Sequence, residues 1–368
     1  MAKVSICTPT FNRRPFINNI IQCILHQDYP KELIEWIVVD DGTDKIEDLV
    51  TKVDGIVVKY FRIDKKMSLG TKRNFCHTKC TGDYIIYMDD DDYYPPTRIS
   101  YAVSELKKSD KLIAGSSEVY VWFKTINKMI QFGPYRENHC TAGTMAFKKE
   151  LLKQTRYDET SEIAEEKHFL KDYTIPVLQL DPLHVILVFS HSHNTFDKSK
   201  LLKSPNKFMK DSDKTVDDFI KEPARKQFFL EQIDQLLDKY DPGLPIHKPA
   251  IILKMLEMEE GRRIKLQDKL KSMVETGANG TFTMKATDGS LTTLTNVQII
   301  KVVTDLQKSN QTLIKMIKDK DILLKDYVKK LTSIEKILKN ELLVDNNIQN
   351  EIVSNPSNDL LASINKKN

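Results

Sequence analysis

The chain has 368 residues, of which 40% are hydrophobic and 29% are charged. This composition excludes a collagen-like, disulfide-scaffold or wholly disordered protein, and the length indicates two or three domains. The net charge of +4 gives no case for nucleic acid as the main partner.

The cysteines and the apolar runs indicate the cellular compartment. All five cysteines precede residue 141, and an odd number of them fits free thiols in a reducing compartment. The first apolar run ends at Pro9, too short for the apolar region of a signal peptide. No stretch approaches the roughly 18–20 apolar residues that cross a bilayer. We therefore expect a cytoplasmic protein without a membrane span.

The first half of the chain alternates short apolar runs with amphipathic stretches. The runs predict strands at residues 3–8, 36–39, 56–61 and 84–88, and the stretches predict helices at 15–26 and 71–81. This alternation is typical of βαβ units with parallel strands. We expect one α/β domain over residues 1–204, with polar groups at the strand ends marking a ligand crevice.

The later segments have different patterns. Residues 118–133 predict an antiparallel hairpin, and residues 205–280 a helical domain or linker. Residues 281–345 predict a β-hairpin, which turns at Asp288-Gly289, followed by a coiled-coil oligomerisation segment. Residues 346–368 are rich in Asn and Ser and predict a disordered tail.

A heptad repeat can be counted from Ile299 onward. One register puts Val303, Asn310, Ile317, Leu324, Leu331 and Leu338 at a, and Ile299, Leu306, Leu313, Lys320, Tyr327 and Ile334 at d. Ten of these twelve positions are apolar, and an Asn at a is typical of parallel coiled coils. The pattern predicts a homo-oligomer through residues 299–340. The alternative is a single long helix packed on the second domain.

Four adjacent aspartates, Asp89 to Asp92, follow the predicted strand at residues 84–88. Neighbouring carboxylates repel one another, and a hard cation such as Mg²⁺ or Mn²⁺ relieves that repulsion. In an extended segment Asp89 and Asp91 share a face and can reach one ion. The alternative is a solvated acidic turn that caps the next helix.

Two further polar elements follow strands. In Val39-Asp40-Asp41-Gly42-Thr43 a carboxylate can accept from a nucleobase or a ribose hydroxyl, or can simply cap the next helix. In the segment from Thr8 to Arg13, Phe11 could stack on a base and Arg13 could reach phosphates. The alternative for this segment is an ordinary strand–helix turn.

Together with Gly70-Thr71-Lys72-Arg73-Asn74, these elements resemble the signature of family-2 glycosyltransferases of the GT-A fold over roughly residues 1–195. The family's Pro-x-aromatic-Asn stands at Pro9 to Asn12, its Val-Asp-Asp-Gly-Ser/Thr at Val39 to Thr43, and its Leu-Asp-x-Asp-Asp at Met88 to Asp92. Lys72 stands where the family usually has a small residue. The resemblance implies a Rossmann-like mixed sheet flanked by helices.

The resemblance also implies a nucleotide-diphosphate sugar donor, usually a UDP-sugar, and a Mn²⁺ or Mg²⁺ ion. The residues it assigns to the nucleotide are Pro9, Phe11, Arg13, Asp40, Asp41, Arg73, Asn74 and Asp90. Those assigned to the metal are Asp91, Asp89 and, in the later segment 190–194, His193. An exposed loop histidine is the alternative for His193.

Inverting members of the family use a carboxylate base from a Glu-Asp pair. The matching pair here is Glu165-Glu166, with Glu in place of Asp, and we expect Glu166 first and Glu165 second as the base. The alternative is an acidic helix face paired with Lys167 and Lys171.

These features predict a metal-dependent enzyme of the hexosyltransferase type that moves a sugar from a nucleotide-diphosphate donor to a hydroxyl acceptor on a glycan, a protein or a small molecule. One alternative is a non-catalytic structural or adaptor protein with a retained transferase-like domain and coiled-coil oligomerisation. A nucleotidyltransferase fits less well, because the segment from Pro9 to Asn12 lacks the glycines of a phosphate loop.

Overall fold

The computed structural model describes residues 1–202, 207–275, 281–285, 290–295, 298–299, 301–306, 308–317, 319–321, 323–324, 326–327 and 330–331. The chain divides into two compact units, Met1–Lys254 and Met255–Asn368. Residues 207–254, predicted to belong to a separate helical domain or linker, therefore pack within the first unit.

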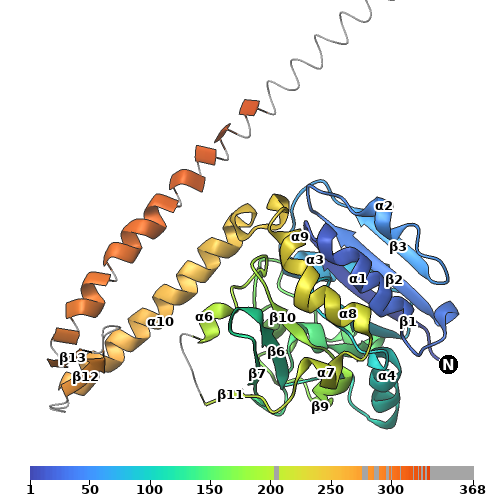
Figure 1. Ribbon diagram of the computed structural model, residues 1–368, viewed down its shortest axis with the longest axis horizontal. Helices are drawn as coiled ribbons and strands as arrows, with labels where there is room; N and C mark the ends of the chain where they lie inside the picture. The colour runs from blue at the N-terminus through green and yellow to red at the C-terminus, as the bar shows by residue number, and fades with distance from the viewer. Residues whose placement is uncertain are drawn as a thin grey trace, which may run out of the picture. The chain divides into compact units, whose positions relative to one another are not determined.

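The central sheet of the first unit has the strand order β3-β2-β1-β4-β8-β5-β9 in the described residues. Figure 1 labels β3, β2 and β1 at one side of this sheet. β1, β2, β3 and β4 pair in parallel, whereas β8 runs antiparallel to β4 and β5. The predicted strands and the mixed sheet are thus confirmed. The bounds are β1 Val4–Thr10, β2 Ile34–Asp40, β3 Val57–Arg62, β4 Tyr84–Tyr87, β5 Ile113–Gly115, β8 Ala146–Lys148 and β9 Val177–Gln179.

Helices cover both faces of this sheet because successive strand residues point to opposite sides. Ile6 of β1 joins the apolar cluster of α1 (Arg14–Leu25) and α4 (Arg98–Lys108). Its neighbour Cys7 joins the cluster of α3 (Leu69–Lys79) on the other face. Short helices α2 (Glu47–Val50) and α5 (Glu166–Phe169) complete this part. The two long helices predicted from periodicity, at residues 15–26 and 71–81, are confirmed as α1 and α3.

A second sheet has the order β10-β6-β7-β11. β6 (Val119–Phe123) and β7 (Lys128–Phe132) form the predicted antiparallel hairpin. β10 (Val188–Ser190) pairs with β6, and β11 (Met209–Asp211) pairs with β7. β11 lies in a region predicted to be helical, and it is a strand because the exposed edge of β7 offers it backbone partners.

The remaining helices run from residue 199 to residue 275: α6 Ser199–Leu202, α7 Val216–Phe219, α8 Pro223–Gln227, a π-helical turn Phe228–Gln232, α9 Ile233–Leu237 and α10 Pro249–Glu275. Phe229, Ile233 and Leu237 of these helices are buried, whereas Leu236 is exposed.

The strand order places three polar segments at one edge of the sheet. β1 pairs with β2 on one side and with β4 on the other, all in parallel. The chain direction therefore brings residues 9–13, 40–43 and 88–92, which end or follow these strands, to the same carboxyl edge. In open α/β sheets such an edge, where the strand order reverses, is where ligands bind.

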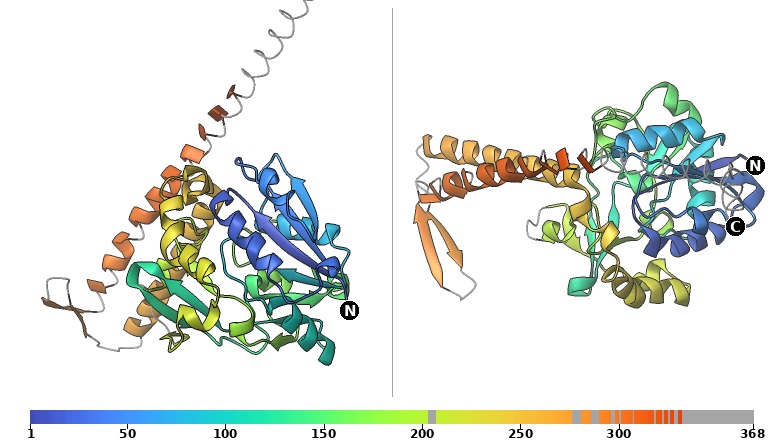
Figure 2. Two further views of the ribbon diagram at one scale, coloured as in Figure 1. Left: turned by 45° about the vertical axis from the view of Figure 1, so that its right-hand side comes forward. Right: turned by 90° about the horizontal axis from the view of Figure 1, so that it is seen from above.

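In the second unit, β12 (Thr281–Lys285) and β13 (Leu291–Thr295) form an antiparallel hairpin at the C-terminal end of α10 (Figure 2). Its predicted turn at Asp288-Gly289 lies outside the described residues. Helical residues follow between 298 and 331, and Gln267 Nε2 of α10 donates to Thr304 Oγ1 at 3.0 Å.

The predicted coiled coil stays a prediction. The a positions Val303, Asn310 and Ile317 are half-buried, whereas Leu313 and Leu331 are exposed. Leu338, Ile334 and the predicted tail lie outside the described residues. Among the helices of the described part, none is both long and apolar enough to cross a membrane.

A buried carboxylate joins the first three strands. Glu35 of β2 is fully buried, and its Oε1 accepts from Ser5 Oγ at 2.5 Å and from Thr81 N at 2.5 Å. Its Oε2 accepts from Lys59 Nζ of β3 at 2.8 Å. Burial by itself raises the pKa of Glu35, but these hydrogen bonds outweigh burial and hold the pKa well below its usual range.

The substitution Glu35→Gln is expected to lower the free energy of unfolding by about 3 kcal/mol at pH 7, because an amide leaves Lys59 without its charge partner. The difference between the variant and the wild type should shrink as the pH falls below about 4, where the unfolded wild type takes up a proton at this carboxyl. Urea unfolding at several pH values measures it. Glu32→Gln, at an exposed position, is the matched control, and an equal effect of both variants would contradict this role.

Candidate functional site

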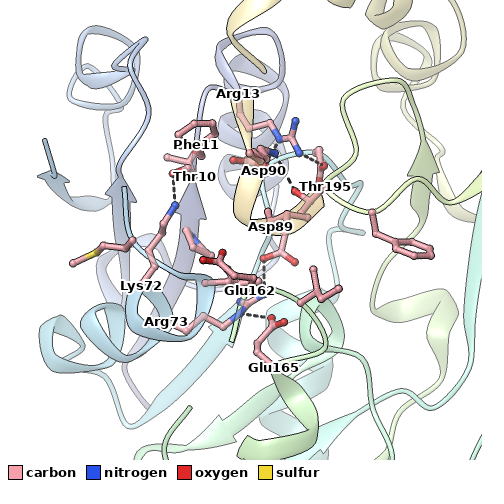
Figure 3. A pocket seen from close by; sticks show the side chains of 18 of the residues that line it. Thr10, Phe11, Arg13, Lys72, Arg73, Asp89, Asp90, Glu162, Glu165 and Thr195 are labelled. Atoms are coloured by element: carbon pink, nitrogen blue, oxygen red, sulfur yellow. Dashed lines mark hydrogen bonds and ion pairs between the residues drawn. The ribbon is translucent and has the colours of Figure 1, made fainter. Parts of the chain in front are cut away.

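A cavity of about 310 Å³ opens at the carboxyl edge of the central sheet (Figure 3). It is lined by the ends of β1 and β4, by the start of α3, and by the segments at 162–165, 195–198 and 248–251. The lining residues are Pro9, Thr10, Phe11, Arg13, Lys66, Met67, Leu69, Lys72, Arg73, Asp89, Asp90, Asp91, Asp92, Glu162, Ile163, Ala164, Glu165, Thr195, Phe196, Lys198, Lys248 and Ile251.

The cavity brings together most, but not all, of the residues chosen from the sequence. Those that line it are Pro9, Phe11, Arg13, Arg73, Asp89, Asp90, Asp91 and Glu165. Those that do not are Asp40, Asp41, Asn74, Glu166 and His193. The surroundings of each are described below.

Arg13 compensates the acidic run from the side of β1. Its Nε lies 3.4 Å from Asp90 Oδ1, and its Nη2 lies 3.2 Å from Asp91 Oδ2. Burial by itself raises the pKa of Asp91, but Arg13 and His191 outweigh burial and hold it well below its usual range. Burial dominates at Asp90 and raises its pKa to about 7. Because its pKa is lowered, Asp91 carries a full negative charge at neutral pH.

Asn12 connects this arginine to the next motif. The backbone of Asn12 is left-handed, with φ of 51°, a conformation that Asn tolerates better than most residues. Its Oδ1 accepts from the backbone N–H groups of Thr43 and Asp44 at 2.7 and 2.9 Å. The turn after β1 is thereby tied to the turn after β2, which sets the direction of Phe11 and Arg13.

Arg73 of α3 compensates the acidic run from the opposite face. Its Nε donates to Glu165 Oε1 at 2.8 Å, and its Nη2 lies 3.5 Å from Asp89 Oδ1 (Figure 3). Its guanidinium lies over the Tyr87 ring, 4.4 Å from the ring centroid. These contacts fix the guanidinium at the cavity wall, between two carboxylates that come from different segments.

Asp40 has a structural role. Its Oδ1 accepts from Gly42 N at 2.9 Å, and its Oδ2 accepts from Ile46 N at 3.1 Å and Tyr60 Oη at 2.8 Å. The carboxylate is fully buried and closes the turn after β2. Asp40 does not cap α2, because the N-terminus of that helix has no side-chain cap.

Asp41 is separated from the cavity by Lys72. The Asp41 side chain is fully buried, Lys72 Nζ donates to its Oδ1, and Met67 N donates to its Oδ2 at 2.7 Å. Lys72 Nζ also donates to Thr10 O at 2.9 Å and lines the cavity (Figure 3). An ammonium group, rather than a carboxylate, therefore faces the ligand space here. The cause is the Lys that replaces the small residue usual at this position.

Asn74 holds the loop that leads to Glu165. Its Nδ2 donates to Tyr157 O at 3.0 Å, and its Oδ1 accepts from Tyr157 N at 2.9 Å. Both ends of the amide are thus used inside the protein, so Asn74 positions the cavity wall instead of lining it.

The prediction that His193 lies next to the acidic run is wrong, because His191 takes that place. His193 Nε2 lies 2.7 Å from Tyr240 O and its Nδ1 lies 3.0 Å from Ser192 Oγ, so both ring nitrogens already have partners. His191 Nε2 instead lies 3.3 Å from Asp91 Oδ2. Burial lowers the pKa of His191 to about 4, so the ring is neutral at pH 7. The two histidines are only two residues apart, and the contacts of their side chains decide which one meets the carboxylates.

The pair Glu165-Glu166 divides between two roles. Glu165 lines the cavity and is bound by Arg73. Glu166, the first residue of α5, is half-buried outside the lining. Burial, and then the charge of Glu165, raises the pKa of Glu166 to about 7. A carboxyl with that pKa is suited to accept a proton near neutral pH.

The donor set suits a divalent cation that shares its shell with other ligands. Within the described residues, no three His, Cys, Asp or Glu side chains form a group that could hold an ion. Asp89 Oδ1 and Asp90 Oδ2 are nevertheless buried oxygens without a hydrogen-bond partner. Mg²⁺ and Mn²⁺ often use one or two carboxylates together with substrate phosphates and waters. The residues fit that mode and do not fit an all-protein cage.

Sequence reasoning missed several lining residues. Lys66, Thr195, Lys198 and Lys248 lie in no recognisable motif, and the last three follow residue 190, far along the chain from the motifs. With them, six basic and six acidic side chains line the cavity. The only signal in the sequence was the unusual Lys72, which departs from the family pattern.

Comparisons with known proteins place these residues in a family. Residues 5–160 match the family described as Glycosyl transferase family 2. The poly(ribitol-phosphate) beta-N-acetylglucosaminyltransferase TarS of Staphylococcus aureus is 30% identical over 96 residues, which are 25% of this chain and 17% of that protein. The poly(ribitol-phosphate) beta-glucosyltransferase of Bacillus spizizenii is 28% identical over 167 residues, 42% of this chain and 26% of that protein.

A solved structure of S. aureus TarS 1–349 superposes with a TM-score of 0.43 and 19% identity, over 51% of this chain and 60% of that chain. The chain spans less than a third of the length of the two curated relatives.

The ion pair of Asp41 and Lys72 is expected to be essential for folding stability. Lys72→Met leaves a buried carboxylate without its counter-charge and should lower the free energy of unfolding by about 3–5 kcal/mol. The double variant Lys72→Met/Asp41→Asn removes both charges and should recover most of that loss. Urea unfolding of Lys72→Met, of Asp41→Asn and of the double variant measures the coupling between the two side chains. Additive losses of unfolding free energy would show that the two side chains do not depend on each other.

Proposed function

Because residues 5–160 match the model of glycosyl transferase family 2, we propose that this chain transfers a sugar from a nucleotide-diphosphate donor to a hydroxyl acceptor. The observation that carries the proposal is the cavity at the carboxyl edge of β1 and β4. It combines buried carboxylates, two guanidinium groups and several ammonium groups in one space. This set of groups suits a diphosphate together with a divalent cation, whose charges largely cancel.

The donor is proposed to be a UDP-sugar, with a sugar of the hexose type. The relatives in S. aureus and B. spizizenii are named as N-acetylglucosaminyl and glucosyl transferases, which supports that class. The acceptor is proposed only as a hydroxyl on a glycan, a protein or a small molecule.

The residues of the cavity have different proposed roles. Asp91 and Asp89 would hold Mn²⁺ or Mg²⁺, which when bound stabilises the negative charge that develops on the leaving diphosphate. Arg13 and Arg73 keep these carboxylates in place and present N–H donors to phosphate oxygens. Phe11 and Lys72 also line the cavity, and the Phe11 ring would pack beside the base of the nucleotide.

The transfer step needs a proton acceptor. We propose that Glu166 takes the proton from the acceptor hydroxyl as its oxygen attacks the anomeric carbon, which inverts the configuration there. Glu165 is already bound by Arg73, so its carboxylate serves to orient that arginine. The raised pKa of Glu166 supports this division of roles.

The metal proposal is tested with Asp91→Asn. In the wild type, Mn²⁺ should tighten UDP binding, measured by titration calorimetry, at least tenfold relative to solutions with EDTA. The variant should bind UDP equally with and without Mn²⁺, because it lacks the carboxylate charge that attracts the ion. Asp64→Asn, at an exposed position, is the control and should behave as the wild type. A full Mn²⁺ effect in Asp91→Asn would remove Asp91 from the metal site.

The base proposal is tested with Glu166→Gln. UDP release from UDP-sugars should fall by roughly 10²–10⁴-fold while UDP affinity stays unchanged, because only the proton acceptor is lost. In the wild type the rate should rise with pH through about 7, as the Glu166 carboxyl loses its proton. Glu165→Gln is the comparison, and it should weaken UDP binding through Arg73. Unchanged turnover in Glu166→Gln would contradict its role, and binding without any turnover in the wild type would favour the adaptor alternative.

A further inference from the structure

Three ammonium groups surround the ring of Phe11 in the cavity. Lys66 Nζ lies 4.4 Å from the ring centroid, Lys248 Nζ lies 5.6 Å from it, and Lys72 Nζ lies 6.0 Å from it. An aromatic ring attracts a cation, but three like charges beside one ring also repel one another. Such a cluster indicates that an anion is to be bound there.

The three lysines differ in what balances their charge. Lys72 is paired with Asp41. Lys248 Nζ donates to the hydroxyl of Thr195 at 3.0 Å, and Lys66 Nζ donates to the carbonyl of Met67 at 3.4 Å. In the part of the chain that the structure describes, neither of these two has a carboxylate within ion-pair distance. Lys248 is the more unusual of the two, because it is only 3% exposed.

Lys248 is held firmly at the cavity wall. It follows the short helical turn Pro245–His247 and directly precedes α10, and Ile251 of α10 lines the same cavity. The segment before it is tied to the first motifs of the chain: Asn12 Nδ2 donates to Pro242 O at 2.8 Å, and Tyr240 Oη donates to Asp44 Oδ2 at 2.8 Å. Thus a segment far outside residues 5–160 supplies part of the site.

Gly243 makes this attachment possible. A Cβ on Gly243 would lie 2.7 Å from His193 Cδ2 and 2.8 Å from Asn12 O, so any larger residue would push the segment away. His193, bound to Tyr240 O, acts on the other side of the same contact. His193, which the sequence suggested as a metal ligand, and Gly243 therefore help to position Lys248.

A buried ammonium without a counter-charge is costly, and a bound anion would remove that cost. Asp90 and Asp91 attract the Lys248 charge, whereas Arg13 and Lys66 repel it. Burial, and then Arg13, lowers the pKa of Lys248 to about 6, so at pH 7 most of this group is an uncharged amine unless an anion lies beside it. A bound anion would raise the pKa and favour the ammonium form. Phosphate oxygens are strong acceptors for such a group. A nucleobase or a sugar hydroxyl carries no charge, so it would not supply the missing counter-charge of Lys248.

We infer that Lys248, with Lys66 beside it, binds the diphosphate of the nucleotide donor, and that the segment from Tyr240 to Ile251 completes the donor site. This inference rests on the proposed function. It assigns a binding role to a part of the chain that the family match does not cover.

The test compares UDP and uridine as ligands of the full chain by titration calorimetry. Lys248→Met should lower the affinity for UDP at least tenfold and leave the affinity for uridine unchanged, because only UDP carries the phosphates. Methionine is close in length to lysine and apolar, so the buried position should accept it. Lys248→Arg keeps the charge and should retain most of the UDP affinity. Lys239→Met, at an exposed position of the same region, is the matched control.

The outcomes separate this inference from the proposed function. UDP binding by Lys248→Met equal to that of the wild type would overturn the inference and leave the proposed function in place. An equal loss for UDP and uridine would also overturn it, because Lys248 would then act on the nucleoside or on folding. Failure of the wild type to bind UDP or to release it from any UDP-sugar would instead overturn the proposed function itself.

Discussion

Charge compensation in a buried space is the constraint on which the site depends. Four consecutive carboxylates follow β4, and all four line one cavity. They can stay together there because Arg13, Arg73 and several lysines come from other segments to balance them. Like charges at this spacing would otherwise lose protons unequally or be driven apart. The pKa values of Asp90 and Asp91, moved in opposite directions, reflect that balance.

The same constraint explains why the two central acidic motifs behave differently. After β2, Asp40 is satisfied by backbone N–H groups and a tyrosine hydroxyl, and Asp41 by Lys72. Neither carboxylate is left for a ligand. After β4, two carboxylate oxygens, on Asp89 and Asp90, lack hydrogen-bond partners. The carboxylates of the first motif are therefore used inside the protein, whereas the second motif leaves two carboxylate oxygens without hydrogen-bond partners.

Residues 207–254 pack within the first unit, together with the segments that line the cavity. β11 extends the second sheet, and the segment from Tyr240 to Ile251 is anchored to Asn12, Asp44 and His193. Its contribution is one buried lysine and one apolar residue of the cavity wall. A site assembled in this way can be varied by changing a distant segment while the strand-end motifs stay the same, which is how one fold can serve different donors and acceptors.

The sequence by itself determined the parallel strands, the helices α1 and α3, the β6–β7 hairpin and the set of strand-end motifs. Those features follow from local periodicity and from the rule that parallel strands present their carboxyl ends at one edge. Only the tertiary structure decided that His191 rather than His193 meets Asp91, that Lys72 covers Asp41, and that Lys248 enters the cavity. These outcomes depend on side-chain direction and on contacts between segments up to 230 residues apart, such as Asn12 with Pro242, which no local pattern encodes.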